Sequence, residues 1–334
     1  MTTEALRDLN TLPGSERRNG STSKDSLTKS YADDTDENLE KWQRKNSAFV
    51  ASTPVNKEEI VNTGVEIGAT EVTEVEYIES EHLNDLEDVD ASVSTLLAGL
   101  DSKDWVLVCE ALNKVRRLSI FHKEAMLDML GNVISLIVKS LKNPRSAVCK
   151  TAIMTSEDIF NAYGDSIIDS LDPLLVQLLL KSSQDKRFVC EVAERALVAM
   201  TTWISPTLLL PKLLPHLKHR NPRIRAKASM CFCRSVPRLG TEGIKAFGVD
   251  KLIQVAAPQL TDQLPESREA ARTLLLELRT VYEKSHVPPL TAESEHPEMD
   301  SWEQFCLSKL SPLTAQAVIR VTNIAKQQGI FVDS

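Results

Sequence analysis

The chain has 334 residues, a formal charge of −8 and 42% apolar residues, enough for one large domain, or two modest ones, plus tails. Only 5% of the residues are aromatic, and there are 11 glycines and 15 prolines, which argues against an all-β sandwich and favours a helical protein. The charge is uneven, because residues 1–90 sum to −12, residues 91–285 to +7 and residues 286–334 to −3. The acidic average therefore hides a basic middle section.

Residues 1–85 are predicted to form a disordered acidic tail, because they hold few large apolar side chains and show no sustained helical period. The tail ends in an acidic run, residues 71–90, with nine Asp or Glu and no Lys or Arg. We interpret this run as a solvating segment. A second hypothesis is that it mimics an acidic partner and competes within the chain for the basic surface described below.

The pattern changes at residue 86, where apolar residues begin to recur at spacings of three and four, as on the buried face of a helix. The predicted helices come in pairs, and the second helices of the pairs begin at similar sequences, near Trp105, Arg145, Arg187, Arg223 and Arg268. These positions are 40, 42, 36 and 45 residues apart, close to the period of HEAT and armadillo repeats. We therefore predict an all-α fold, a HEAT/armadillo-type α-solenoid of about five helical pairs over residues 86–285.

Two of these helix starts share the tripeptide Asn-Pro-Arg, at residues 143–145 and 221–223. Asn caps a helix because its side-chain oxygen accepts an otherwise unpaired N–H, and Pro is well tolerated at the first helical position. Residues 286–299 are predicted to be a linker, and residues 300–334 a C-terminal helical segment that either caps the solenoid or acts alone.

Motifs for catalysis are missing from the sequence. There is no Gly-rich phosphate loop, no Gly-x-Ser-x-Gly elbow and no His-Glu-x-x-His, and the six histidines are scattered. Cys231 and Cys233 lie two apart on a predicted helix and therefore point in different directions, with no second pair at zinc spacing. We expect a protein that is not an enzyme and has no cofactor or metal.

The most informative residues lie in the turns between the two helices of each pair, which align along one edge of a solenoid. The first turn carries Trp105, and every later turn carries Lys or Arg. A row of positive charge fits an acidic partner, and Trp and Arg are common at binding hot spots. The alternatives are that the row is ordinary solvated surface and that Trp105 is tucked between the helices of the first repeat.

At these turns the sequence resembles the TOG domains of the CLASP and crescerin families, and it is closest to plant armadillo-like and TOG-like proteins. The resemblance rests on residues 100–105, 118–122, 142–148 and 217–225, and covers roughly residues 88–285. TOG domains are HEAT-repeat domains, usually with six repeats, that bind the tubulin heterodimer along their intra-repeat turns. The resemblance thus implies a microtubule-associated protein.

The resemblance also implies roles for individual residues. The Trp of the first turn contacts β-tubulin in the family, and Trp105 matches it. The second and third turns contact the same subunit, and the fourth and fifth reach α-tubulin. The matching basic residues are Lys142, Arg145, Lys186 and Arg187 for the former and Arg220, Arg223 and Arg268 for the latter.

Two other functions remain open at this stage. One is a general helical-repeat scaffold that binds another acidic protein or a peptide through its concave groove. The other is nucleic-acid binding through residues 218–227, which hold five Lys or Arg but no aromatic residue for base stacking. With no secretory signal and no apolar run of about 18 residues, we expect free thiols, no membrane span, and a location on cytoplasmic microtubules, with the nucleus as an alternative.

Overall fold

The structure is a computed structural model that describes residues 77–285 and 301–327. Both ranges lie in one compact unit, which spans residues 71–334. Within these ranges the regular elements are α-helices and short 3-10 helices, without a strand. The prediction of an all-α fold is confirmed. None of the helices in the described ranges has both the length and the apolar character that a membrane crossing requires.

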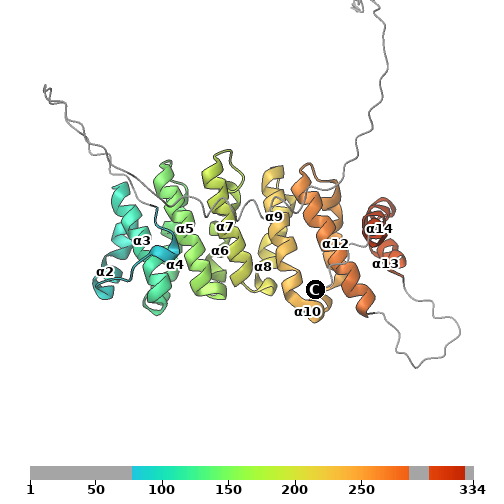
Figure 1. Cartoon of the computed structure of the whole chain (residues 1–334), viewed down its shortest axis with the longest axis horizontal. Helices are drawn as coiled ribbons and strands as arrows, with labels where there is room; N and C mark the ends of the chain where they lie inside the picture. The colour runs from blue at the N-terminus through green and yellow to red at the C-terminus, as the bar shows by residue number, and fades with distance from the viewer. Residues whose placement is uncertain (1–76, 286–300, 328–334) are drawn as a thin grey trace, which may run out of the picture. The chain divides into compact units, whose positions relative to one another are not determined.

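The helices form antiparallel pairs that follow one another in chain order (Figure 1). The pairs are α2 (Val89–Leu100) with α3 (Trp105–Phe121), α4 (Leu130–Leu141) with α5 (Ser146–Tyr163), α6 (Leu171–Lys181) with α7 (Arg187–Trp203), α8 (Pro206–Leu213) with α9 (Pro222–Ser235), α11 (Val249–Ala256) with α12 (Pro265–Ser285), and α13 (Trp302–Lys309) with α14 (Pro312–Gln327). A short helix, α10 (Gly240–Phe247), stands between the fourth and fifth pairs. The 3-10 helices are η1 (Ser80–His82), η2 (Lys123–Met129), η3 (Gly164–Ser170), η4 (Leu214–Lys218), η5 (Pro237–Leu239) and η6 (Ala257–Thr261).

The second helices of successive pairs pack side by side, α3 against α5, α5 against α7, α7 against α9 and α9 against α12. The apolar stripes of both helices in each pair meet in one core that continues from pair to pair, with Leu112, Ile153 and Leu175 fully buried. One pair alone would leave half of its apolar face in water, so the stack of neighbours supplies the stability.

Side-chain hydrogen bonds in the turns mark where the second helices begin. The side-chain oxygens of Asp104, Asn143 and Asn221 each accept the N–H two residues later, at 2.9 Å. Each bond satisfies a donor that has no partner inside the helix. Asp104 and Asn221 are the N-cap residues of α3 and α9, whereas α5 begins at Ser146 after the N-cap Arg145, so the predicted cap at Asn143 is a turn bond two residues ahead of the helix cap.

Residues 86–285 hold the five helical pairs that the sequence predicts, and the C-terminal helical segment adds a sixth pair that caps the solenoid. Trp302 of α13 is buried against Tyr282 of α12, with ring centroids 5.5 Å apart, and its indole N–H donates to Thr322 of α14. Arg279 of α12 donates to Asn323 of α14 at 2.7 Å. The sixth pair thus covers the apolar end of the fifth. The linker predicted at residues 286–299 lies outside the described residues.

The predicted boundary of the tail at residue 85 also needs correction. Residues 77–86 pack on α3, α5 and α7, and Leu83 is 5% exposed. Most contacts of residues 77–86 are hydrogen bonds and ion pairs, which leave no periodic apolar pattern in the sequence. Residues 1–76 of the predicted tail lie outside the described residues.

Candidate functional site

The turns that join the two helices of each pair lie along one edge of the helical stack, the upper one in Figure 1. Adjacent second helices pack side by side and run in the same direction, so their first residues stand next to one another. We call this the turn edge, and define it by the turns before α3, α5, α7, α9 and α12. All eight site residues predicted from the sequence lie on it or one helical turn from it.

Trp105 and Arg145 form a unit across the first two turns. The Trp105 side chain is partly buried against the core, and the Arg145 guanidinium carbon lies 5.1 Å from the ring centroid. A cation over the face of an indole is attracted by the negative charge of the π-cloud. The ring is therefore held from below by the core and from above by Arg145, and is neither fully exposed nor fully tucked between helices.

Four cations of the turn edge point into solvent. Lys142, Lys186 and Arg220 are exposed and form no ion pair with any residue in the described ranges. The side chain of Arg187 is 87% exposed, although its Nε bonds to Glu191 one helical turn away. Exposed ion pairs of this kind are weak, so Arg187 remains available to a partner.

Arg223 is a less available cation. Its Nη1 bonds to the carboxylate of Asp185 in the third turn and to the carbonyl of Ser183 at 3.3 Å. Arg223 therefore links the fourth turn to the third, much as Arg145 links the second turn to the first. A partner anion would have to compete with Asp185 for this guanidinium.

Arg268 was assigned to the turn edge in register with Arg223, and the structure changes that register. Pro222 and Pro265 begin α9 and α12, so Arg268 corresponds to Arg225. The Arg268 side chain donates to the carbonyls of Asp262 and Gln263 at 2.8 and 2.9 Å, and is partly buried. It closes its own turn instead of presenting a charge.

Arg225 does the same in the fourth turn and also joins it to the fifth. It donates to the carbonyls of His219 and Arg220, and its Nε lies 2.6 Å from Asp262. Burial alone raises the pKa of the Asp262 carboxyl, but hydrogen bonds from Arg225 and from the Leu264 N–H outweigh it and hold the pKa below its ordinary value.

The basic segment 218–227 has fewer unpaired cations than its sequence suggests. Arg223 and Arg225 are paired as described, and Lys227 reaches Glu194 at 2.6 Å. Three of its five cations are therefore already neutralised within the protein. Phosphate binding draws on unpaired Lys and Arg, which here leaves Lys218 and Arg220.

The turn edge also presents Phe188, an aromatic side chain that is 45% exposed and is not among the residues predicted from the sequence. Phe188 is the second residue of α7 and directly follows Arg187. The signal was available, because the buried residues of α7 begin at Val189 and continue with Val192 and Ala193, which leaves Phe188 off the apolar stripe. An exposed aromatic beside two exposed cations is a typical binding anchor.

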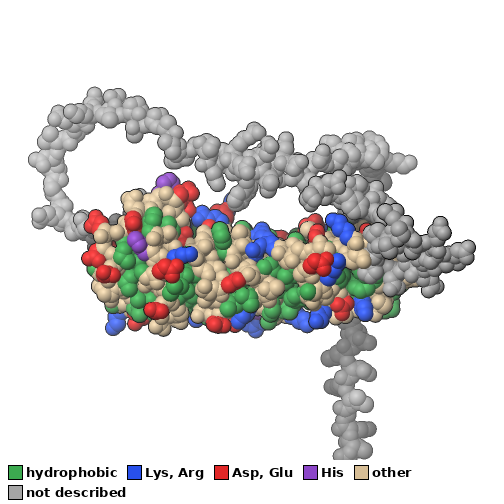
Figure 2. All heavy atoms as spheres, turned by 90° about the horizontal axis from the view of Figure 1, so that it is seen from below, with side chains coloured by type: hydrophobic (Ala, Val, Ile, Leu, Met, Phe, Trp, Pro, Cys, Tyr) green, Lys and Arg blue, Asp and Glu red, His purple; other side chains and the backbone are tan. Residues whose placement is uncertain are grey.

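The opposite edge differs in character. Figure 2 views the described helices from the side on which α12 ends, and there acidic, basic and hydrophobic side chains are intermixed. Charges of both signs next to one another produce little net potential. This mixture contrasts with the turn edge, where Lys142, Lys186 and Arg220 have no acidic partner among the described residues.

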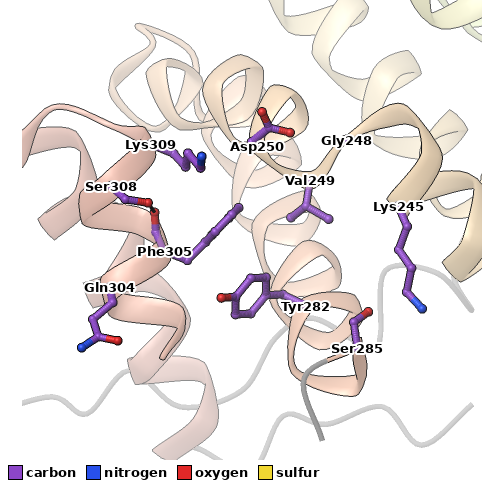
Figure 3. A pocket seen from close by; sticks show the side chains of 10 residues that line it. All are labelled: Lys245, Gly248, Val249, Asp250, Tyr282, Ser285, Gln304, Phe305, Ser308 and Lys309. Atoms are coloured by element: carbon purple, nitrogen blue, oxygen red, sulfur yellow. Dashed lines mark hydrogen bonds between the residues drawn. The ribbon is translucent and has the colours of Figure 1, made fainter. Parts of the chain in front are cut away.

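A cavity of about 690 Å³ opens between α10, α11, α12 and α13 (Figure 3). The rings of Tyr282 and Phe305 contact each other in it, tilted by 33° with centroids 4.5 Å apart, and Lys245 of its lining pairs with Glu242. Gly248 has a φ of +104°, and an added Cβ there would lie 2.8 Å from the Asp250 carboxylate, so the turn between α10 and α11 requires glycine. The lining residues contain no paired nucleophile and base.

Burial keeps Cys231 and Cys233, the two neighbouring cysteines of α9, in the thiol form. Burial raises the pKa of the Cys231 thiol to about 12 and that of Cys233 to about 11. In the ranges 77–285 and 301–327, no three His, Cys, Asp or Glu side chains are grouped as metal ligands would be.

Comparisons with known proteins bear on the fold of the chain. No protein-family model matches the chain. It is 27% identical over 206 residues to the mouse (Mus musculus) TOG array regulator of axonemal microtubules protein 1, a match that covers 60% of the chain but only 12% of that relative. The chain thus spans about an eighth of the length of this curated relative.

Two solved structures share the arrangement of helices. The TOG domain of Zyg9 from C. elegans superposes with a TM-score of 0.51 at 16% identity, covering 75% of this chain and 91% of that one. A chain from the structural study of microtubule plus-end tracking by XMAP215, CLIP-170 and EB1 gives a TM-score of 0.52 at 16% identity, covering 73% and 95%. The described helices therefore have the fold of a TOG domain. The relative found by sequence is likewise a TOG protein by its name.

Proposed function

We propose that the chain is a non-enzymatic microtubule-associated protein that binds tubulin through the turn edge. The similarity to a TOG array regulator of axonemal microtubules and the TOG-domain fold support this function. The observation that carries it is the Trp105–Arg145 unit, which stands at one end of a row of exposed, unpaired cations on a single edge.

The parts of the edge have different tasks in this proposal. Trp105 and Phe188 supply apolar contact area, and Arg145 holds the indole in place while adding charge. Lys142, Lys186, Arg187 and Arg220 attract the acidic tubulin surface and fix the register of docking. Arg223 and Arg268, which were predicted as contacts, mainly shape the turns. The protein would then be located on the microtubule cytoskeleton.

Size-exclusion chromatography of the full-length chain with purified αβ-tubulin tests the proposal. Wild type should co-elute with tubulin at low salt, and Lys142→Glu/Lys186→Glu should not. The matched control is Lys123→Glu/Lys284→Glu, the same charge change at two exposed residues near the C-terminal ends of α3 and α12, away from the turn edge. Co-elution of Lys142→Glu/Lys186→Glu at wild-type level would refute the turn edge as the binding site, and no wild-type co-elution at low salt would refute tubulin as the partner.

Salt provides an independent reading of the same complex. Exposed charges are screened over about 8 Å at physiological ionic strength, so the affinity should fall steadily as salt is raised. Lys142→Glu/Lys186→Glu should show a shallower dependence than Lys123→Glu/Lys284→Glu. Equal salt dependence in both would contradict a role for Lys142 and Lys186.

A further inference from the structure

A second surface, distinct from the turn edge, binds a stretch of the chain itself. Residues 77–86, here called the docked segment, lie across the outer faces of α3, α5 and α7 (the blue end of the coloured ribbon in Figure 1). Apart from the three-residue turn η1, the docked segment has no regular structure. It is held by side chains from three consecutive repeats, and these contacts have the character of peptide recognition.

The centre of this surface is an ion pair between Arg116 of α3 and Asp158 of α5. Arg116 Nε lies 2.7 Å from Asp158 Oδ2, and the two side chains are 1% and 2% exposed. The remaining donors and acceptors of the pair point to the docked segment. Arg116 donates to the Ile78 carbonyl at 2.7 Å and to the Ser80 hydroxyl at 3.1 Å, while that hydroxyl donates to Asp158 at 2.6 Å.

Further contacts extend the surface on both sides of Ser80. Arg195 of α7 donates to the Glu79 carboxylate at 3.0 Å, and Lys150 of α5 lies 3.8 Å from the centre of the Tyr77 ring. At the other end, His122 bonds to Asp85 at 2.7 Å. The surface therefore recognises a backbone carbonyl, a hydroxyl and carboxylates, spread over an extended stretch.

The surface is formed without help from the docked segment. Arg116 also bonds to Asn113 in its own helix, and Arg195 bonds to Glu157 of the neighbouring α5. These bonds depend on the packing of α3, α5 and α7, which the core provides. The groups beneath Glu79 and Ser80 are polar, so water can hydrate them when the segment lifts, and the apolar contacts that are lost are those of Leu83 and Leu86.

We propose that this surface is a peptide-binding site occupied in cis by the docked segment, and that it accepts in trans an extended acidic peptide with a Glu-Ser pair at its centre. The Glu carboxylate pairs with Arg195, and the Ser hydroxyl bridges Arg116 and Asp158. The cis segment competes at a high effective concentration because it is tethered to the domain. Binding in trans therefore requires that the segment be weakened or displaced.

The same contacts bear on the hypothesis that the acidic run mimics an acidic partner and competes for the basic turns. In residues 77–90, the ion pairs are those of Glu79 with Arg195 and Asp85 with His122, and not with the cations of the turn edge. The described part of the run thus occupies its own surface. The docked segment therefore competes with other peptides for this surface, and not with a partner that binds the turn edge.

The test uses the full-length chain and a peptide with the sequence of residues 77–88, labelled with fluorescein at its C-terminus. Ser80→Glu should weaken the docked segment, because a carboxylate cannot donate to Asp158 and is repelled by it. Fluorescence anisotropy should show that this variant binds the wild-type peptide at least tenfold more tightly than the wild-type chain does. Asn84→Glu is the matched control, since it adds the same charge at an exposed residue of the segment and should behave as wild type.

A second variant tests the receptor side. Adding Arg195→Ala to the Ser80→Glu chain should lower the affinity for the peptide about fivefold, and a peptide with Glu in place of Ser should not bind. Hydrogen exchange of residues 78–83 should be faster in Ser80→Glu than in Asn84→Glu. If the segment exchanges faster but the peptide binds no better than to wild type, the surface is only a structural contact and the proposal is wrong. Unchanged exchange in Ser80→Glu would also overturn it, since Ser80 would then not hold the segment.

Discussion

Arg225 and Arg268 occupy the same position in the fourth and fifth repeats, and each donates from Nη1 to the carbonyls five and six residues before it. The bonds close the turn ahead of the second helix. Carbonyls at a helix–turn junction lack helical partners, and an arginine that bonds two of them replaces water. These two arginines therefore stabilise turns, while the neighbouring exposed cations remain available for binding.

Replacing Arg268 with Met should lower the free energy of unfolding by about 1–3 kcal/mol, because two hydrogen bonds from a charged donor are lost. Urea unfolding followed by circular dichroism measures this change. Arg220→Met, which removes an exposed cation with no ion pair in the described ranges, should leave the midpoint unchanged. Wild-type stability together with lost tubulin binding in Arg268→Met would show that Arg268 is a contact residue after all.

Stability should depend on pH through the Arg225–Asp262 pair. The folded-state pKa of Asp262 is lowered, so the pair stabilises the fold above the unfolded pKa near 4, and this stabilisation is lost as the pH falls through the folded value. Arg225→Gln should therefore be less stable than wild type at pH 7, and the difference should narrow at pH 3. Chemical unfolding at both pH values measures it, and a difference that stays constant would contradict the assignment.

Trp105→Ala should weaken tubulin binding about 30-fold, the loss expected for a hot-spot residue worth about 2 kcal/mol. Arg145→Ala should weaken it less, and the two losses should not add, because Arg145 positions the indole it covers. A double-mutant cycle of dissociation constants gives the coupling, for which we expect about 0.5–1 kcal/mol. Thermal unfolding of each variant controls for loss of core packing, and strictly additive losses would show that the two residues act separately.

Phe188→Ser should reduce the affinity for tubulin about five- to tenfold without loss of stability, because its ring is largely outside the core. Val198→Ser is the control, since Val198 lies on the same helix, is 41% exposed and is far along α7 from the turn. Isothermal titration calorimetry compares the two. Equal affinities would leave Phe188 as a surface residue without a role in the complex.

The features that could be predicted from the sequence depend on local chemistry. Trp105 and Arg187 begin helices where the repeats place them, and Asn221 caps α9 as its tripeptide indicates. Spacing and capping act over a few residues, so the order of residues determines them directly.

The features that could not be predicted depend on contacts between distant residues. The role of Arg268 follows from the carbonyls that its side chain reaches, and its register with Arg225 was obscured by the nearby Arg223. The docked segment is held by Arg116 and Asp158, which lie 42 residues apart and about 40 and 80 residues from Ser80. Polar contacts of this kind leave no periodic pattern.

The side-by-side packing of α3, α5, α7 and α9 has a consequence for selectivity. Packed helices are about 8–10 Å apart, which sets a fixed interval between the cations of neighbouring turns. That interval is close to the distance over which salt screens a charge. Each turn therefore influences its immediate neighbours and hardly the turns beyond them. A partner surface is selected by whether its anions recur at the same interval, so an acidic protein with a different spacing would match one turn and miss the next.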